Sequence, residues 1–315
     1  MNKITTSVHS VRQLCDDIFE YTLVSPGGAL LPIFDPGAHI DVFVTDAITR
    51  QYSLIGSGEE TKHYRIAVQR EKNGRGGSLR LVENLRPGSP VDISSPRNNF
   101  KLQDAEEVIL LAGGIGITPL IGMAEYLSKH KRKFSLHYFC RSKNRQIDIH
   151  ALCPSLDLDA VTIHCDDNQD MEKKPLETLL LSPKDNTRIY FCGPGGFMNK
   201  IVELTALWPK EKLHKESFSA EPIKADVNSE SFNVQLLKSR RVITVGSSES
   251  ILDAFKRSGI DVHSSCESGL CGSCKVRYVS GTPIHNDLIL SNEERETHML
   301  VCVSRSSSRE LVIDL

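Results

Sequence analysis

Residues 266–274 read CESGLCGSC, and this short stretch decides the architecture of the last third of the chain. Its cysteines have the spacing Cys-x4-Cys-x2-Cys, and a fourth cysteine stands well downstream. Gly269 and Gly272 within the stretch allow backbone amides to approach whatever the thiolates bind. The candidate metal ligands are Cys266, Cys271, Cys274 and Cys302.

Four thiolates in this arrangement predict a [2Fe–2S] cluster, because three ligands on one loop and one distant ligand match the plant-type ferredoxin spacing. A structural zinc site is disfavoured, since such sites usually show two short cysteine pairs. A Rieske centre is also disfavoured, because it needs two histidine ligands and the stretch contains none.

The composition of the chain excludes several other classes of protein. Its 315 residues carry 38 Lys and Arg against 40 Asp and Glu, so no basic field is available to bind nucleic acid. The longest uncharged run, residues 108–124, is interrupted by glycines and a proline, which predicts a strand, a turn and a helix start instead of a membrane span. The N-terminal residues lack the apolar core of a secretory signal. We expect a cytoplasmic protein with no nucleic-acid partner and no membrane partner.

The pattern of apolar residues changes along the chain and predicts three domains. Residues 1–104 are short alternating segments between turn signals, typical of an antiparallel β-barrel. Residues 105–222 alternate apolar strands with helical stretches, which is the pattern of a parallel-sheet nucleotide-binding domain. A polar linker at 221–230 leads into residues 230–315, the cysteine-containing unit. The expected fold class is therefore multi-domain α/β plus β, ending in a β-grasp-like [2Fe–2S] ferredoxin domain.

Two glycine-rich turns follow strands of the second domain. LLAGGIGITPL, at 110–120, lies between an apolar strand and a helix expected to begin near Thr118 and Pro119, and CGPGG follows at 192–196. Glycines admit a diphosphate to the backbone, and a helix N-terminus supplies amides for it. A glycine turn alone also fits simple packing, but both turns lie at strand carboxyl ends, where parallel sheets bind nucleotides. The spacing differs from the GxGxxG fingerprint of standard dehydrogenases.

The first domain carries a cation, an aromatic ring and a hydroxyl along one strand, RQYSL at 50–54. The basic turn GRGGS follows at 74–78 and leads into a helical stretch. Ser78 and the backbone amides of this turn suit a phosphate, with Arg50 or Arg75 as its countercharge. The same residues, taken alone, also fit an ordinary strand and a solvated turn.

The motifs RQYSL, GRGGS, GGIGITP, CGPGGFM and CESGLCGSC together resemble, in this order, the phthalate dioxygenase reductase family, over essentially the whole chain. The resemblance implies an FMN-binding barrel, an NAD-binding domain and a C-terminal ferredoxin domain; FMN is implied over FAD because members with this domain order typically carry FMN. The implied FMN contacts are Arg50, Gln51, Tyr52, Ser53, Ala67, Val68, Gln69, Arg75, Gly76, Gly77 and Ser78. The implied nicotinamide-nucleotide contacts are Gly113, Gly114, Gly116, Thr118, Pro119, Cys192, Gly193 and Pro194, with Phe218 near the flavin face.

The resemblance also implies two catalytic residues: Ser53, hydrogen-bonded to the N5 edge of the flavin, and Cys192, near the reacting nicotinamide ring. One departure concerns the loop after Arg141, where this chain has KNRQIDIHALCP and relatives usually show a short acidic-aromatic stretch. The loop on the nicotinamide side is therefore expected to differ. Basic residues in this loop favour a 2′-phosphate, whereas Asp166 and Asp167 oppose it, and NADH is the expected coenzyme.

NADH delivers two electrons at once, whereas the cluster accepts one at a time, and a flavin can take a pair and release single electrons. The implied path runs from NADH to FMN, to [2Fe–2S] and to an external acceptor, which by resemblance is a terminal Rieske-type oxygenase. The cluster domain carries nearly balanced charge, so we expect transient docking. An alternative is a self-sufficient NADH-dependent reductase of ferric chelates or flavins. A redox-sensing regulator is a further alternative, which leaves RQYSL and GRGGS without a role.

Overall fold

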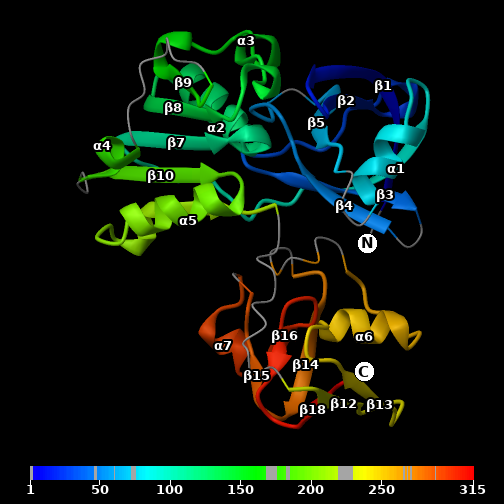
Figure 1. Ribbon diagram of the computed structural model, residues 1–315. Coiled ribbons are helices and arrows are strands. Elements are labelled where there is room, and N and C mark those ends of the chain that lie inside the picture. Colours follow the sequence, from blue (N-terminus) through cyan, green and yellow to red (C-terminus); the bar gives the residue numbers. More distant parts are fainter. Residues whose placement is uncertain are drawn as a thin grey trace. The chain divides into compact units, whose positions relative to one another are not determined.

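The computed structural model divides the chain into two compact units, Met1–Ser217 and Phe218–Leu315 (Figure 1). The predicted boundary between residues 104 and 105 falls inside the first unit, so the division into three domains stays a prediction. The structure describes residues 3–45, 48–59, 61–71, 76–167, 176–181, 185–218, 230–264, 267, 269, 272–287 and 289–315. Arg75, Cys266, Cys271 and nearly all of the predicted linker lie outside these described residues.

Six antiparallel strands form the first sheet and close into a barrel. The strands are β1 (Lys3–Cys15), β2 (Ile18–Val24), β3 (His39–Thr45), β4 (Ile48–Ser53), β5 (His63–Gln69) and β6 (Pro90–Ser94). Their order is β4-β3-β6-β1-β2-β5, and an isolated bridge joins Leu54, directly after β4, to Ile66 in β5. The two edge strands therefore meet. Helix α1 (Gly77–Asn84) lies against β3, β4 and β5.

Five parallel strands form the second sheet. They are β7 (Glu107–Gly113), β8 (Lys133–Cys140), β9 (Val161–Cys165), β10 (Thr187–Cys192) and β11 (Leu213–Glu216). Their order is β11-β10-β7-β8-β9, so the chain builds outward from β7 to one side and then returns to the other. The carboxyl ends of β7 and β10 form the switch point at which open parallel sheets bind ligands.

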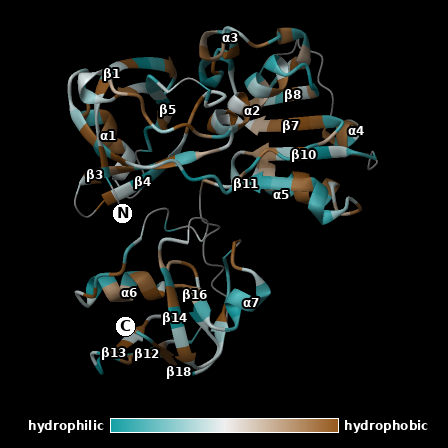
Figure 2. Cartoon of the chain, turned by 180° about the vertical axis from the view of Figure 1, so that it is seen from behind, coloured by the Kyte–Doolittle hydropathy of each residue, from teal (hydrophilic) through white to brown (hydrophobic). Residues whose placement is uncertain are grey.

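Helices cover both faces of this sheet, because alternate residues of its strands are apolar on both sides. Leu110 and Tyr190 pack in one core cluster, whereas Leu111 and Phe191 pack in another (Figure 2 shows β7 largely in brown). Helix α2 (Ile117–Lys129) contributes to the first cluster, and α4 (Leu176–Leu180) and α5 (Gly195–Leu204) contribute to the second. The short α3 (Ile149–Leu152) follows β8 and also joins the first cluster.

The barrel and the parallel sheet share a core within the first unit. Ile18, Ile55 and Ala67 of the barrel belong to the same apolar cluster as the buried face of α2. A Cβ on Gly122 of α2 would lie 2.3 Å from the Gly56 carbonyl oxygen, so only glycine permits this approach. The carboxyl end of β4 is thereby held near the carboxyl ends of β10 and β11.

The second unit is built on a mixed five-stranded sheet with the order β13-β12-β18-β14-β16. Its central pair, β12 and β18, is parallel, and the other pairs are antiparallel. Helix α6 buries Ile251, Leu252, Ala254 and Phe255. The elements are β12 (Phe232–Leu236), β13 (Val242–Val245), α6 (Ile251–Arg257), β14 (Lys275–Ser280), β15 (Pro283–Ile284), α7 (Asn292–Arg295), β16 (His298–Leu300), β17 (Arg305–Ser306) and β18 (Glu310–Ile313).

These sheets confirm the predicted fold class: an antiparallel barrel, a parallel sheet with helical crossovers and a C-terminal mixed sheet. The predicted helix after the first glycine turn is α2, with Pro119 in its first turn as expected. Among the helices of the described residues, none is both long and apolar enough to cross a membrane.

Candidate functional site

The predicted phosphate end of the flavin site lies where β4 meets α1. Gly77 begins α1, and a Cβ on it would lie 2.4 Å from Arg50 Nε, so the guanidinium lies against the helix N-terminus. Gly76 precedes it with φ +81, a left-handed conformation that favours glycine. Ser78 Oγ accepts a hydrogen bond from the Glu71 amide at 3.2 Å and retains its own proton for donation. A cation beside unpaired helix amides fits an anionic phosphate.

The strand residues predicted to contact the flavin ring differ in whether a side chain or only the backbone is available for that contact. The Gln51 side-chain nitrogen is buried and has no hydrogen-bond partner among the described residues, which fits an acceptor supplied by a ligand. Burial raises the pKa of the Tyr52 hydroxyl, an effect that the Arg50 charge opposes. The Val68 side chain packs inside the barrel, and Ala67 packs in the core shared with α2. Contacts of these two residues with a flavin would therefore be made mainly by their backbone.

The two predicted nucleotide turns lie face to face at the switch point. A Cβ on Gly116 would lie 2.2 Å from the Cys192 carbonyl oxygen, and one on Gly193 would lie 3.0 Å from the Gly113 Cα. A Cβ on Gly113 would meet the Pro194 ring at 3.0 Å. Gly116 is therefore required by the contact between the turns, and Gly113 and Gly193 let the turns pack closely.

Among the other residues of the first turn, Gly114 is open to a ligand, whereas Thr118 and Pro119 are buried in the protein. Gly114 has φ +53 and open space where a Cβ would stand, so its backbone is approachable by a diphosphate at the start of α2. Thr118 is buried and donates its hydroxyl to the Ile115 carbonyl at 3.1 Å. Pro119 is buried in the same helix turn.

Both predicted catalytic residues lie next to a third residue that the sequence analysis missed. Ser53 Oγ, at the end of β4, donates to Glu216 Oε2 at 3.2 Å. Glu216 is the last residue of β11 and pairs with Cys192, the last residue of β10. We call Ser53, Glu216 and Cys192 the junction, because they join the barrel to the carboxyl edge of the parallel sheet.

Both titratable groups of the junction are shifted toward their neutral forms. Burial raises the pKa of Glu216 to about 8, and the Ser53 hydrogen bond opposes this shift only in part. Burial, reinforced by the Glu216 charge, raises the pKa of the Cys192 thiol well above its ordinary value. A neutral, desolvated site suits the passage of a hydride between two rings. The available sequence signal for Glu216 is its position in HKESF, two residues before Phe218, a spacing that places both side chains on the same face of an extended strand.

Phe218, predicted near the flavin face, is 45% exposed and begins the second unit. Its predicted role stays a prediction.

In the second unit, Cys274 and Cys302 come together at the ends of paired strands. Cys274 directly precedes β14 and Cys302 follows β16, and the Val301 amide donates to the Cys274 carbonyl at 3.3 Å. Gly269 and Gly272 have φ +71 and +73. A Cβ on Gly269 would lie 2.8 Å from Val303 Cγ2, so the loop is closely seated. Buried thiols on such a loop fit a [2Fe–2S] cluster, with Cys266 and Cys271 outside the described residues.

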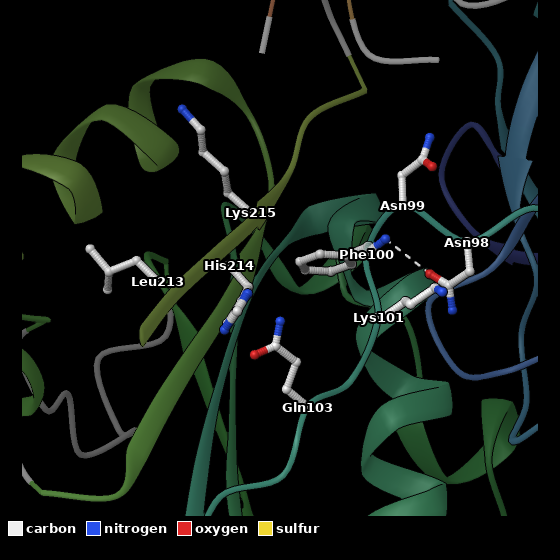
Figure 3. A pocket seen from close by; sticks show the side chains of 8 residues that line it. All are labelled: Asn98, Asn99, Phe100, Lys101, Gln103, Leu213, His214 and Lys215. Atoms are coloured by element: carbon white, nitrogen blue, oxygen red, sulfur yellow. Dashed lines mark hydrogen bonds between the residues drawn. The ribbon is translucent and has the colours of Figure 1, made fainter. Parts of the chain in front are cut away.

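A polar cleft of about 400 Å³ lies along β11 and residues 98–103 (Figure 3). Gln103 and His214 lie side by side in it, and the Phe100 amide donates to Asn98 Oδ1. None of the predicted site residues lines this cleft. It therefore has no place in the site built above.

Comparison with known proteins agrees with this geometry. Residues 234–307 match the model of the 2Fe-2S iron-sulfur cluster binding domain. The chain is 37% identical to phthalate dioxygenase reductase of Burkholderia cepacia, over 98% of this chain and 96% of that protein. The chain belongs to the phthalate dioxygenase reductase family. A solved phthalate dioxygenase reductase, a modular structure for electron transfer from pyridine nucleotides to [2Fe–2S], matches with a TM-score of 0.76 and 36% identity, over 100% of this chain and 98% of that chain.

Other proteins match the chain with similar sequence identity. Vanillate O-demethylase oxidoreductase of Pseudomonas sp. (strain HR199 / DSM 7063) is 37% identical over 99% of this chain and its whole length. An intact type IV self-sufficient cytochrome P450 monooxygenase matches with a TM-score of 0.80 and 34% identity, over 99% of this chain and 41% of that chain. The family confirms the predicted class, an iron–sulfur flavoprotein oxidoreductase that uses pyridine nucleotides, and the predicted [2Fe–2S] cluster.

Proposed function

We propose that this chain is the reductase component of a multicomponent oxygenase. It takes electrons from NADH and delivers them through FMN and [2Fe–2S] to a terminal Rieske-type oxygenase that docks transiently. Full-length similarity to the reductases of phthalate and vanillate systems supports this acceptor. A net charge of -2 provides no basic field for nucleic acid or anionic lipid, and the location that we propose is cytoplasmic, with neither kind of partner.

The observation that carries the proposal is the junction. When bound, FMN would accept the two electrons of one hydride and release them one at a time. The Ser53 hydroxyl, at the end of β4, donates to Glu216 at 3.2 Å, and we assign its oxygen to the N5 edge of the flavin. Cys192 is fully buried at the end of β10, its thiol pKa is raised by burial, and we assign it to the nicotinamide side. In this proposal these residues lie beside the two rings and orient them through uncharged polar groups.

We assign the remaining contacts on the same basis. Arg50 and the N-terminus of α1 hold the FMN phosphate, and Gln51 donates to a polar ring edge. Gly114 and the start of α2 receive the nucleotide diphosphate. Three domains with the boundaries 1–104, 105–222 and 230–315 carry the three redox groups.

The preference for NADH is supported at the carboxyl end of β9. Asp167 is exposed, accepts the Lys143 amide at 3.2 Å and accepts the Cys165 thiol at 2.9 Å. The hydrogen bond from the thiol, followed by that from the amide, lowers the pKa of Asp167, so the carboxylate stays charged. A fixed anion there repels a 2′-phosphate.

The test of the proposal is anaerobic reduction of the purified holoprotein by NADH. We expect NADH to bleach the flavin and the cluster, and Ser53→Ala to slow flavin reduction about 10- to 100-fold while FMN content stays unchanged. Ser10→Ala, an exposed serine of the same barrel, is the matched control. An unchanged rate in Ser53→Ala would refute the role of the junction.

The acceptor is tested separately. Purified oxygenase plus this chain should turn over substrate with NADH, and ferric chelates should be reduced far more slowly. Efficient reduction of ferric chelates without coupling to any oxygenase favours the self-sufficient reductase. Slow NADH turnover with every acceptor favours a regulator.

A further inference from the structure

A buried carboxylate lies beside the cluster loop and has no part in the function derived above. Asp287 is 3% exposed, and its Cα lies 3.2 Å from the position of a Cβ on Gly269, between the predicted ligands Cys266 and Cys271. Ile289, two residues on, places its Cδ1 3.3 Å from the corresponding position on Gly272. The segment around Asp287 therefore packs directly on the loop that carries three of the cluster ligands.

Asp287 holds this segment in place through its hydrogen bonds. Its Oδ1 accepts the amides of Ile289 at 3.2 Å and Leu290 at 2.8 Å. Arg295, the last residue of α7, donates to the Asp287 carbonyl at 2.9 Å and to Oδ1 at 3.4 Å. Three donors therefore converge on one oxygen of Asp287.

The charge of Asp287 is only partly balanced. Its side chain is 0% exposed, whereas that of Arg295 is 34% exposed and is screened by solvent. Asp287 Oδ2 has no hydrogen-bond partner within the described part of the chain and lies 3.8 Å from His285 Nδ1. Burial, reinforced by Arg295 and opposed by Asp287, lowers the pKa of His285, so this imidazole adds no cation at neutral pH.

We propose that Asp287 is a positioning residue of the [2Fe–2S] cluster and lowers its reduction potential. It seats the segment bearing Ile289 on the cluster loop, and its enclosed negative charge makes the addition of an electron to the cluster less favourable. Arg295 works in the opposite direction and limits the effect. The inference depends on the cluster, not on which oxygenase receives the electrons.

Redox titration of the full-length holoprotein, followed by the EPR signal of the reduced cluster, tests the proposal. We expect Asp287→Asn, which keeps an acceptor oxygen but removes the charge, to favour reduction about tenfold, equivalent to about 59 mV upward for one electron. Arg295→Gln should shift the potential downward, and Arg295→Lys should leave it near the wild-type value. Glu293→Gln, which removes an exposed charge from α7, is the matched control and should shift it little.

Opposite signs for Asp287→Asn and Arg295→Gln separate an electrostatic role from simple loosening, which would move both in the same direction. Iron content is measured in every variant. Equal signs, or no shift in Asp287→Asn with full iron content, would overturn the proposal. If Asp287→Asn loses iron, the Arg295→Gln result decides: a lower potential supports the proposal and an unchanged one refutes it.

Discussion

Glu216 at the junction and Asp287 beside the cluster loop are both carboxyl groups withdrawn from water, but they receive different donors. Glu216 accepts the Ser53 hydroxyl at 3.2 Å, and its pKa is raised to about 8. Asp287 accepts two backbone amides and faces the Arg295 guanidinium at 3.4 Å. Burial favours the neutral carboxyl unless donors compensate, so enclosure alone does not decide the charge.

The difference matches what we propose for each region. The junction is the proposed place of hydride transfer, and its carboxyl group is shifted toward the neutral form. Beside the cluster, a fixed charge is useful because single electrons are added to and removed from one place. The following predictions test whether the two regions are separate and whether their carboxyl groups behave as described.

The largest expected effect is complete loss of the cluster in Cys302→Ala. This variant should lose its iron and all coupling to the oxygenase, because one of four ligands is missing. NADH oxidation with ferricyanide, two equivalents per NADH, should stay within about twofold, since hydride transfer uses the first unit. Cys153→Ala, a buried cysteine outside the predicted ligand set, should keep its iron. Loss of ferricyanide activity in Cys302→Ala would contradict the separation of the two regions.

Truncation of the two carboxyl groups should destabilise the units unequally. Asp287→Ala leaves the Ile289 and Leu290 amides without their side-chain acceptor and removes the carboxylate beside the Arg295 guanidinium, which should cost about 3 kcal/mol. Glu216→Ala at pH 7 removes a neutral group with one hydrogen bond, which should cost about 1 kcal/mol. In urea unfolding, cluster absorbance reports the second unit, and Trp208, the single tryptophan, is buried in the first. Equal losses would remove the distinction between the two sites.

The stability of the first unit should fall with rising pH because of Glu216. Its pKa is raised from 4.5 to about 8 on folding, so its contribution is complete below pH 4.5 and is lost as pH rises through 8. Between pH 6 and pH 8 the nucleotide-free protein should lose about 2 kcal/mol relative to Glu216→Gln, measured by Trp208 fluorescence. His39 and His214, whose pKa values are lowered to about 4 mainly by burial, are common to both proteins and cancel in this difference. Parallel pH profiles would show that Glu216 is charged at neutral pH.

The smallest expected effect is confined to the phosphate end of the flavin site. Arg50→Ala should weaken FMN binding about tenfold, or about 1.4 kcal/mol, and leave the iron content unchanged. Arg80→Ala, an exposed arginine on the same helix α1, controls for general loss of positive charge. Equal FMN affinity in Arg50→Ala and the wild type would reduce Arg50 to a surface strand residue.

Local patterns in the sequence determined the class of each element and most of the chemistry. The spacing of CESGLCGSC predicts the cluster because ligands on one loop are close in the chain and need no fold to bring them together. Apolar alternation predicts the barrel strands, and longer apolar runs predict the parallel sheet, since side-chain periodicity is a local property. The glycine turns are also local, and the structure places both at the switch point.

Only the tertiary structure decided what those turns and the polar residues do. Ser53 and Glu216 are 163 positions apart, and their contact depends on the packing of α2 on the barrel and on the register that pairs Glu216 with Cys192. Gly113, Gly116 and Gly193 are predicted nucleotide contacts in the sequence, and the structure shows that they also let the two turns approach each other closely. Asp287 belongs to none of the motifs recognised in the sequence, yet it is enclosed. Burial and partners are set by residues distant in the chain, and they decide whether a carboxyl group carries a proton or a charge.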